Sequence, residues 1–245
     1  MQLGLKTSCK DTQYTERILS LFNEGIFQYI ELFIIPQTFN DFFNYWKSLS
    51  IPIIIHAPHS YAGMNLSLIG QRDYNKSILE ETFRYADILD AEYIIFHSGL
   101  DGNIDETINQ LRPFADSRCL VENKPAIGLN DEKCIGSIPE EIKHIMRELN
   151  CGFCLDFGHA ICAANTHKYD PFEFINSFMD IIPSMFHLTD GDYKSEYDSH
   201  LHYKEGDYPL SDIINLIPDN AKVTNEAKND KLFTCFISDA KFLLK

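Results

Sequence analysis

Short apolar runs that end in a possible metal ligand recur along the chain. Six runs rich in apolar, β-branched or aromatic residues lead directly to His56, His97, Glu122, Asp156, His187 and Glu226. An apolar run has no physical reason to stop so often at histidine or a carboxylate, unless the ends converge on one polar site. Parallel strands whose carboxyl ends meet are typical of a (β/α)8 barrel, where active sites lie at that face. The pattern predicts a fold and a metal site together.

Strand and helix patterns alternate along the chain. Strands are expected at 2–6, 27–33, 51–56, 92–97, 118–122, 152–156, 184–187 and 221–226. Helices are expected at 12–24, 38–48, 71–90, 104–115, 138–149, 171–180, 209–217 and 233–243. Residues 78–89, for example, have apolar side chains at helical spacing. Eight units of about 30 residues predict an α/β fold, a single-domain TIM barrel over residues 1–245, with a doubly wound open sheet as the alternative.

The two longest predicted loops follow the third and the seventh strand, at 57–70 and 188–208. The first contains His59 and Tyr61, and the second contains the segment Asp198-Ser199-His200-Leu201-His202. Long ordered loops on the carboxyl face of a barrel often carry substrate recognition. We therefore expect both loops to border the site.

Composition narrows the class of protein. The hydrophobic content of 44% and charged content of 23% are ordinary for a globular protein. No apolar run is long enough to span a bilayer, and the first residues lack the layout of a secretory signal. We therefore expect a cytoplasmic protein without a membrane partner, whose seven cysteines are reduced thiols. Cys151 and Cys154 form a lone CxxC in a predicted buried strand, which indicates small core residues rather than a zinc site.

The net charge of −15 disfavours a nucleic acid as partner. Proteins that bind nucleic acids usually carry a basic surface, whereas this chain has 21 basic and 36 acidic residues. The argument is mild, because bound divalent metals would add positive charge at the site itself.

Nine short segments with histidine or carboxylate residues follow one another along the chain. They are Glu31 in Ile30-Glu31-Leu32, His56 in His56-Ala57-Pro58, His97 in His97-Ser98-Gly99, Glu122 in Glu122-Asn123, Asp156 and His159 in Asp156-Phe157-Gly158-His159, His187 in His187-Leu188-Thr189-Asp190, Asp198 and His200 in Asp198-Ser199-His200, Glu205-Gly206, and Glu226 in Asn225-Glu226. In this order they resemble the xylose isomerase-like TIM barrel superfamily. That superfamily includes sugar phosphate isomerases and epimerases, and endonuclease IV (AP endonuclease family 2). The resemblance covers essentially the whole chain.

An inner metal site is expected from Glu122, Asp156, His187 and Glu226. Carboxylates with one imidazole suit Mn²⁺, Mg²⁺ or Zn²⁺ and leave room for substrate oxygens. In the sugar isomerases and epimerases of the superfamily, such a metal polarises a carbonyl and a neighbouring hydroxyl. The resemblance then implies that Glu122 and Glu226 are catalytic bases, which exchange a proton at the adjacent carbon.

The resemblance to endonuclease IV implies additional ligands and a trinuclear zinc site. The first zinc would be held by His56, His97 and a bridging Glu122. The second would be held by Asp156, His187 and Glu226, again with Glu122, and the third by His159, Asp198 and His200. Clustered metals suit phosphodiester hydrolysis, because they generate hydroxide at neutral pH and stabilise the attacking and leaving oxygens.

Two more residues are candidate substrate contacts. Glu31 either contacts the substrate or closes the barrel mouth, and His202 lies close to His200 in the chain. His59, His144 and His167 match no ligand position, and His144 is expected at the surface of an amphipathic helix.

Departures from the endonuclease IV pattern favour the isomerase-like branch. That family typically has Asp-Thr-Cys-His where this chain has Asp156-Phe157-Gly158-His159, and Gly-Glu-Gly where this chain has Lys204-Glu205-Gly206. The complete set of nine ligands favours the opposite conclusion, because a mononuclear isomerase does not require it.

We therefore expect a divalent-metal-dependent enzyme, with one to three Zn²⁺ or Mn²⁺ ions, that acts on a small sugar or sugar phosphate by metal-assisted proton transfer. The alternative is an endonuclease IV-like phosphodiesterase. A non-catalytic scaffold stabilised by metals is the weakest hypothesis, because open carboxylate-rich sites are costly unless they are used. The sequence does not identify the substrate, the metal or the oligomeric state.

Overall fold

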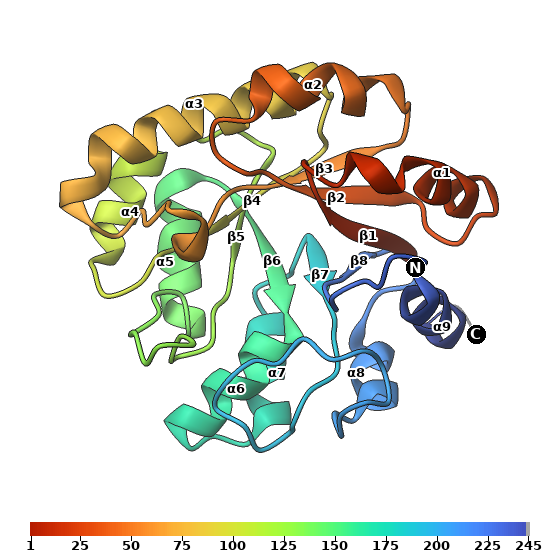
Figure 1. Ribbon diagram of the computed structural model, residues 1–245. Helices are drawn as coiled ribbons and strands as arrows, with labels where there is room; N and C mark the ends of the chain where they lie inside the picture. Colours follow the sequence, from red (N-terminus) through yellow and green to blue (C-terminus); the bar gives the residue numbers. More distant parts are fainter. Residues whose placement is uncertain (244–245) are drawn as a thin grey trace.

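Eight parallel strands close into a barrel with helices around it (Figure 1). The computed structural model describes residues 1–243. Each strand pairs with the next, and the last strand pairs with the first. The strands are β1 (Gln2–Ser8), β2 (Tyr29–Phe33), β3 (Ile53–His56), β4 (Ile94–His97), β5 (Cys119–Glu122), β6 (Gly152–Asp156), β7 (Met185–His187) and β8 (Lys222–Asn225). The predicted (β/α)8 barrel is confirmed, and the open sheet is excluded.

The helices follow the strands in the expected order, with small differences at their ends. They are α1 (Thr15–Asn23), α2 (Phe39–Ser48), α3 (Arg72–Ile88), α4 (Ile104–Leu111), α5 (Pro139–Leu149), α6 (Phe157–His167), α7 (Pro171–Met179), α8 (Leu210–Leu216) and α9 (Thr234–Leu243). Among residues 1–243, no helix has the length and apolar character that crossing a bilayer requires.

Helix α6 was not predicted from the sequence. Its residues from Phe157 to Ala164 are all buried, and the helix packs against α7. A helix that is buried on every side has no polar face, so the 3.6-residue alternation that reveals surface helices is missing. Asp156 begins the helix, because its Oδ1 accepts a hydrogen bond from the backbone N–H of His159 at 2.8 Å.

The barrel has an apolar interior below a polar mouth. Six residues from six strands form a separate cluster inside it, namely Tyr29, Ile54, Ile95, Leu120, Cys154 and Met185. Tyr29 also fills the space beside Gly4, where an added Cβ would lie 2.3 Å from its ring. On the eighth strand, Thr224 Oγ1 lies 3.0 Å from Tyr29 Oη. A larger cluster packs the outer faces of the strands against the helices.

The six residues of the interior cluster, with Gly4 on β1 and Thr224 on β8, give one interior position on each of the eight strands. Because side chains alternate across a strand, the residue two places after each of them points to the same side, one step closer to the mouth. We call these eight the mouth positions; they are Lys6, Glu31, His56, His97, Glu122, Asp156, His187 and Glu226. All eight are polar, and seven of them are His, Asp or Glu. The regular alternation of side chains along the strands therefore places a polar site at one end of an apolar barrel interior.

Candidate metal centre

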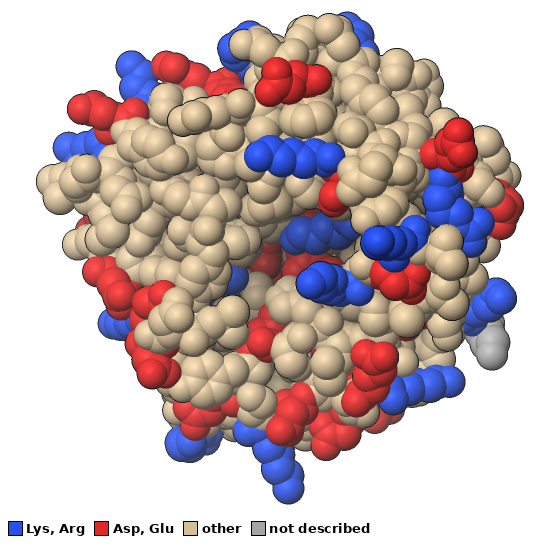
Figure 2. All heavy atoms as spheres, in the orientation of Figure 1, with Lys and Arg blue, Asp and Glu red and all other residues tan. Residues whose placement is uncertain are grey.

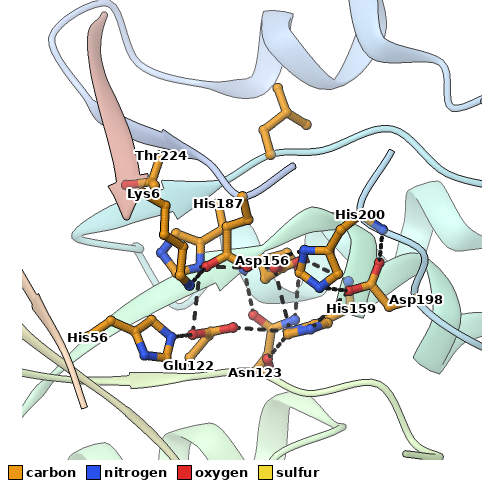
Figure 3. A network of polar contacts seen from close by, with 12 residues as sticks. Lys6, His56, Glu122, Asn123, Asp156, His159, His187, Asp198, His200 and Thr224 are labelled. Atoms are coloured by element: carbon orange, nitrogen blue, oxygen red, sulfur yellow. Dashed lines mark hydrogen bonds and ion pairs between the residues drawn. The ribbon is translucent and has the colours of Figure 1, made fainter. Parts of the chain in front are cut away.

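Nine histidine and carboxylate side chains gather at the barrel mouth in three sets, and Figure 3 shows part of this group around Glu122 and Asp156. Within each set, one possible ligand atom of every residue lies within 4.8 Å of the others. The first set is His56, His97 and Glu122, the inner set is Glu122, Asp156, His187 and Glu226, and the third set is His159, Asp198 and His200. These are the nine residues that the sequence suggested, in the same three groups.

Two histidines of the first set point at one oxygen of Glu122. His56 Nε2 lies 3.3 Å and His97 Nε2 lies 3.1 Å from Glu122 Oε2. The other ring nitrogen of His56 lies 2.8 Å from the carbonyl oxygen of Ala57. When that nitrogen donates a hydrogen bond to the carbonyl, Nε2 of the neutral ring keeps a lone pair that faces the centre.

The inner set is centred on His187. Its Nδ1 lies 2.9 Å from Glu226 Oε1 and 3.6 Å from Glu122 Oε2. Its Nε2 lies 2.9 Å from Glu31 Oε2, and both side chains are completely buried. Glu31 therefore contacts His187 from behind and does not line the cavity above the centre. A carboxylate in this position fixes the orientation of an imidazole ligand and raises its basicity.

The third set joins the start of α6 to the loop after β7. Asp198 Oδ2 lies 3.3 Å from His159 Nε2 and 2.5 Å from His200 Nε2. The second nitrogen of His159 lies 2.8 Å from the carbonyl oxygen of Asn123. The amide of Asn123 also exchanges two hydrogen bonds with the backbone of Asp156. The segment after β5 thus holds the first turn of α6 in place.

Several buried polar atoms of these sets form no hydrogen bond of good geometry within residues 1–243, although oppositely charged groups lie close to some of them. They include His56 Nε2, Glu122 Oε1, His187 Nδ1 and Asp198 Oδ2. Buried polar atoms are almost always paired, because an unpaired one costs free energy. Here the unpaired atoms are ligand atoms, and they lie in the sets described above. Imidazoles mixed with carboxylates suit Zn²⁺ or Mn²⁺, so the residues fit divalent metal ions.

The charges of the centre are strongly coupled. Burial alone would raise the pKa of Glu122, but His97 and His187 hold this pKa well below its usual range. Burial alone would lower the pKa of His159, yet Asp156 and other neighbouring acceptors raise it to about 10. Carboxylates likewise raise the pKa of His187 against the effect of burial. Imidazoles that carry protons here would have to lose them before they bind a metal.

A cavity of about 640 Å³ opens above the centre. Figure 2 shows the hollow near the middle of this face, with acidic and basic side chains at its walls. Apolar side chains also line it, including Tyr14, Phe33, Tyr61, Ile127, Leu129 and Phe233. Three lysines complete the lining, namely Lys6, Lys124 and Lys228.

The sequence analysis missed several residues that line this cavity. Lys6 ends an apolar run at β1, as the candidate ligands do at other strands. Lysine is not a usual metal ligand, so this position was not considered. Lys124 belongs to a third long loop after β5, which pairs with itself between Ile127 and Lys133. Its position directly after Glu122-Asn123 was the available signal. His59 stacks on His97 at a ring distance of 5.2 Å.

His202 lies away from the cavity lining. Its Nδ1 lies 2.6 Å from Asp239 Oδ2 on α9, and its Nε2 lies 3.1 Å from the carbonyl oxygen of Lys228. The side chain thus joins the loop after β7 to the loop after β8. Direct contact of His202 or Glu31 with a substrate stays a prediction, but in this structure both side chains face protein groups.

Known proteins resemble the chain in sequence and in fold. "Probable endonuclease 4" of Thermoplasma volcanium is 32% identical over 53% of this chain and 49% of the relative. The chain spans about half the length of the curated relatives it matches.

Two solved structures cover nearly all of both chains. Endonuclease IV from Thermus thermophilus has a TM-score of 0.73 and 17% identity, covering 100% of this chain and 99% of that one. A putative xylose isomerase from Rhodospirillum rubrum has a TM-score of 0.76 and 13% identity, covering 100% and 98%. At such low identity these two structures show the fold alone. Residues 27–231 match the family model described as a xylose isomerase-like TIM barrel. The chain therefore belongs to the xylose isomerase-like TIM barrel family.

Proposed function

We propose that this protein is a hydrolase of phosphoric esters that uses three neighbouring divalent cations. The observation that carries the proposal is the third ligand set, in which both imidazoles lie within 3.3 Å of Asp198. A proton-transferring isomerase needs only the inner set, whereas ester hydrolysis at clustered metals uses all three. The sequence alone favoured the isomerase, and the geometry of the third set reverses that order.

The residues supply binding and orientation in such a reaction. When bound, clustered divalent cations supply hydroxide at neutral pH and stabilise charge on the attacking and leaving oxygens. Glu122 belongs to both the first and the inner set, so its carboxylate fixes the spacing between them. Glu31 and Asn123 orient His187 and His159 from behind. The lysines and apolar walls of the cavity would hold an anionic ester with an apolar or aromatic portion.

The size of the cavity bounds the substrate. A volume of about 640 Å³ lies within the range of roughly 300–1,000 Å³ that is usual for small-molecule sites. A small phosphoric ester fits inside such a space, and a larger substrate would have to extend beyond the rim.

A sugar isomerase or epimerase is the second candidate. Glu122 Oε2 and Glu226 Oε1 lie 3.6 Å and 2.9 Å from the same atom, His187 Nδ1. Two carboxylates on one prospective metal site are what a two-base exchange of a proton beside a carbonyl requires. This observation involves the inner set alone and assigns no role to the third set.

The two candidates are separated by the variant His159→Gln. Metals per chain are counted after loading with Zn²⁺ or Mn²⁺, and two reactions are followed. These are hydrolysis of bis(4-nitrophenyl) phosphate and hydrogen exchange beside the carbonyl of ketoses and their phosphates. His144→Gln is the matched control, because His144 lies on α5 and contacts Asp105 outside the cavity.

We expect three ions in the wild-type protein and in the control, and two in His159→Gln. Hydrolysis should fall by about 100-fold or more in His159→Gln and stay unchanged in the control. A single ion per chain with exchange on a ketose, unaffected by His159→Gln, would refute the hydrolase and support the isomerase.

A further inference from the structure

Two of the mouth positions, Lys6 and Glu31, lie outside the three ligand sets. Their strands pair with Lys6 directly opposite Glu31, and Lys6 Nζ lies 3.1 Å from Glu31 Oε1. The same ammonium donates a hydrogen bond to Glu226 Oε1, which belongs to the inner set. Figure 3 shows the Lys6 side chain reaching down beside His187. Lys6 therefore links a buried carboxylate to a candidate metal ligand.

The ammonium of Lys6 lies beside a group of side chains that could otherwise bind a metal cation. Glu31, His56 and Glu226 form a further group with ligand atoms within 4.8 Å of one another. Lys6 contacts both carboxylates of this group. A metal ion accepts electron pairs, but an ammonium only donates hydrogen bonds. The protein thus places its own positive charge beside the inner set, in a form that can bind an anion.

The free side of this ammonium faces the cavity. Lys6 lines the cavity and its side chain is 20% exposed, whereas Glu31 is fully buried and does not line it. An ammonium has three N–H donors, and within residues 1–243 its charged partners are the two carboxylates. A third donor remains for a molecule in the cavity.

The surroundings favour an anionic molecule. The three ligand sets contain four carboxylates, and three divalent cations would carry more positive charge than those carboxylates carry negative charge. Lys124 and Lys228 line the same cavity. The cavity would then be positive although the chain has a net charge of −15. A phosphoryl group gains charge-assisted hydrogen bonds from such a site, and an uncharged sugar does not.

We propose that Lys6 binds the phosphoryl group of the substrate, donating a hydrogen bond to a non-bridging oxygen beside the inner ligand set. This assignment rests on the proposed function, since it requires a phosphoric ester in the cavity. It makes Lys6 a catalytic residue contributed by β1, which, like β2, supplies no ligand to the three sets. Glu31 keeps the ammonium in place from below and also contacts His187.

The test measures binding of inorganic phosphate to the metal-loaded protein by calorimetry. Lys6→Gln removes the charge, Lys6→Met is a second neutral variant, and Lys6→Arg keeps the charge. Lys10→Gln is the matched control, because Lys10 follows β1, is exposed and does not line the cavity. Metals per chain are counted for every variant.

Loss of a charge-assisted hydrogen bond should weaken phosphate binding by roughly ten- to a hundredfold in Lys6→Gln and Lys6→Met. The metal count should stay at the wild-type value. Lys6→Arg should retain most of the affinity, and Lys10→Gln all of it. If Lys6→Gln does not fold, Lys6→Met and Lys6→Arg carry the comparison.

Wild-type affinity for phosphate in the neutral variants would overturn the assignment, and so would a wild-type protein that binds no phosphate. A reduced metal count in Lys6→Gln would also overturn it, because Lys6 would then act on Glu226 and not on the substrate. Phosphate binding needs no turnover. A protein that binds phosphate through Lys6 but hydrolyses no ester would refute the proposed function and leave this assignment standing.

Discussion

At the residue scale, three histidines of the candidate centre are each anchored through one ring nitrogen. His56 uses the carbonyl of Ala57, His159 that of Asn123, and His187 the carboxylate of Glu31. A neutral imidazole has one donor and one acceptor nitrogen, so a partner on one side decides which nitrogen can bind a metal. The backbone and Glu31 thus decide which nitrogen can bind a metal once the ring is neutral.

The protonation of His159 predicts how the metal-free protein responds to pH. Its pKa is raised to about 10 in the folded chain, from about 6.5 in an unfolded one. A raised pKa contributes stability that is complete below pH 6.5 and is lost as the pH rises towards 10. The chelator-treated protein should therefore melt at lower temperature at pH 8.5 than at pH 6.5, with a loss on the order of 1 kcal/mol per pH unit.

The metal-loaded protein should show the opposite trend in the same window, because metal ions bind imidazoles only after the protons have left. Thermal denaturation between about pH 6.5 and 8.5, with and without Zn²⁺, measures both slopes. In His159→Gln the slope of the metal-free form should flatten. Equal slopes in the two forms of the wild-type protein would contradict the assignment of a proton to this site.

At the scale of elements, Asp156 serves both β6 and α6. Its Oδ1 caps α6 by accepting the N–H of His159, and its Oδ2 lies 4.0 Å from His187 Nδ1 in the inner set. One carboxylate therefore starts a helix and belongs to the candidate metal centre. The place of His159 in the third set depends on where that helix begins.

Two substitutions at Asp156 should separate these roles. Asparagine can still cap a helix but provides no negative charge, and alanine does neither. Both variants should bind fewer metal ions than the wild-type protein. With chelator present, Asp156→Ala should be less stable than Asp156→Asn by about 1 kcal/mol, as measured by urea denaturation.

The control is Asp170→Asn, since Asp170 caps α7 in the same way through Phe172 and Glu173. It should change neither the metal count nor the stability appreciably. Equal stability of the two Asp156 variants would show that the cap contributes nothing.

The helices and strands also differ in how far they could be predicted from the sequence. Strand ends could be located because apolar runs and polar ends are local patterns, and the nine candidate ligands were implied by the resemblance to the superfamily. Helix α6 could not be located from the sequence, because burial of its residues 157–164 removes the polar face that marks a surface helix. The proposed role of Lys6 depends on the pairing of β1 with β2, which brings it to Glu31, and on closure of β1 with β8, which brings it to Glu226. His59 touches His97 only through the path of the loop after β3.

At the scale of the whole molecule, acidic residues outnumber basic ones, but the cavity has lysines in its lining. The chain has 21 basic and 36 acidic residues, yet three lysines line one cavity. They come from β1 and from the loops after β5 and β8, and not from the two loops that the sequence singled out. Outside the hollow, Figure 2 shows acidic and basic side chains intermixed over this face.

Tight binding of duplex DNA is therefore not expected. A duplex requires several phosphates to be neutralised outside the cavity, and each contact adds to a salt-dependent affinity. At about 0.15 M salt we expect a dissociation constant weaker than about 1 μM for a duplex with an abasic site, measured by fluorescence anisotropy.

Undamaged duplex of the same length is the control and should bind no more tightly. Nanomolar binding of the abasic duplex that weakens steeply with salt, together with metal-dependent nicking, would show that the substrate is DNA and that the small-ester substrate is wrong.

The seam between β1 and β8 has a consequence for how the protein matures. Lys6 and Glu226 are 220 positions apart, and they meet only when the first strand pairs with the last. Contacts between such distant parts of a chain are among the slowest to form. While the ribosome has not yet synthesised β8 and the residue after it, the chain lacks Glu226, so its inner site is incomplete. Newly made protein should thus acquire its full metal complement only after synthesis has passed the last strand.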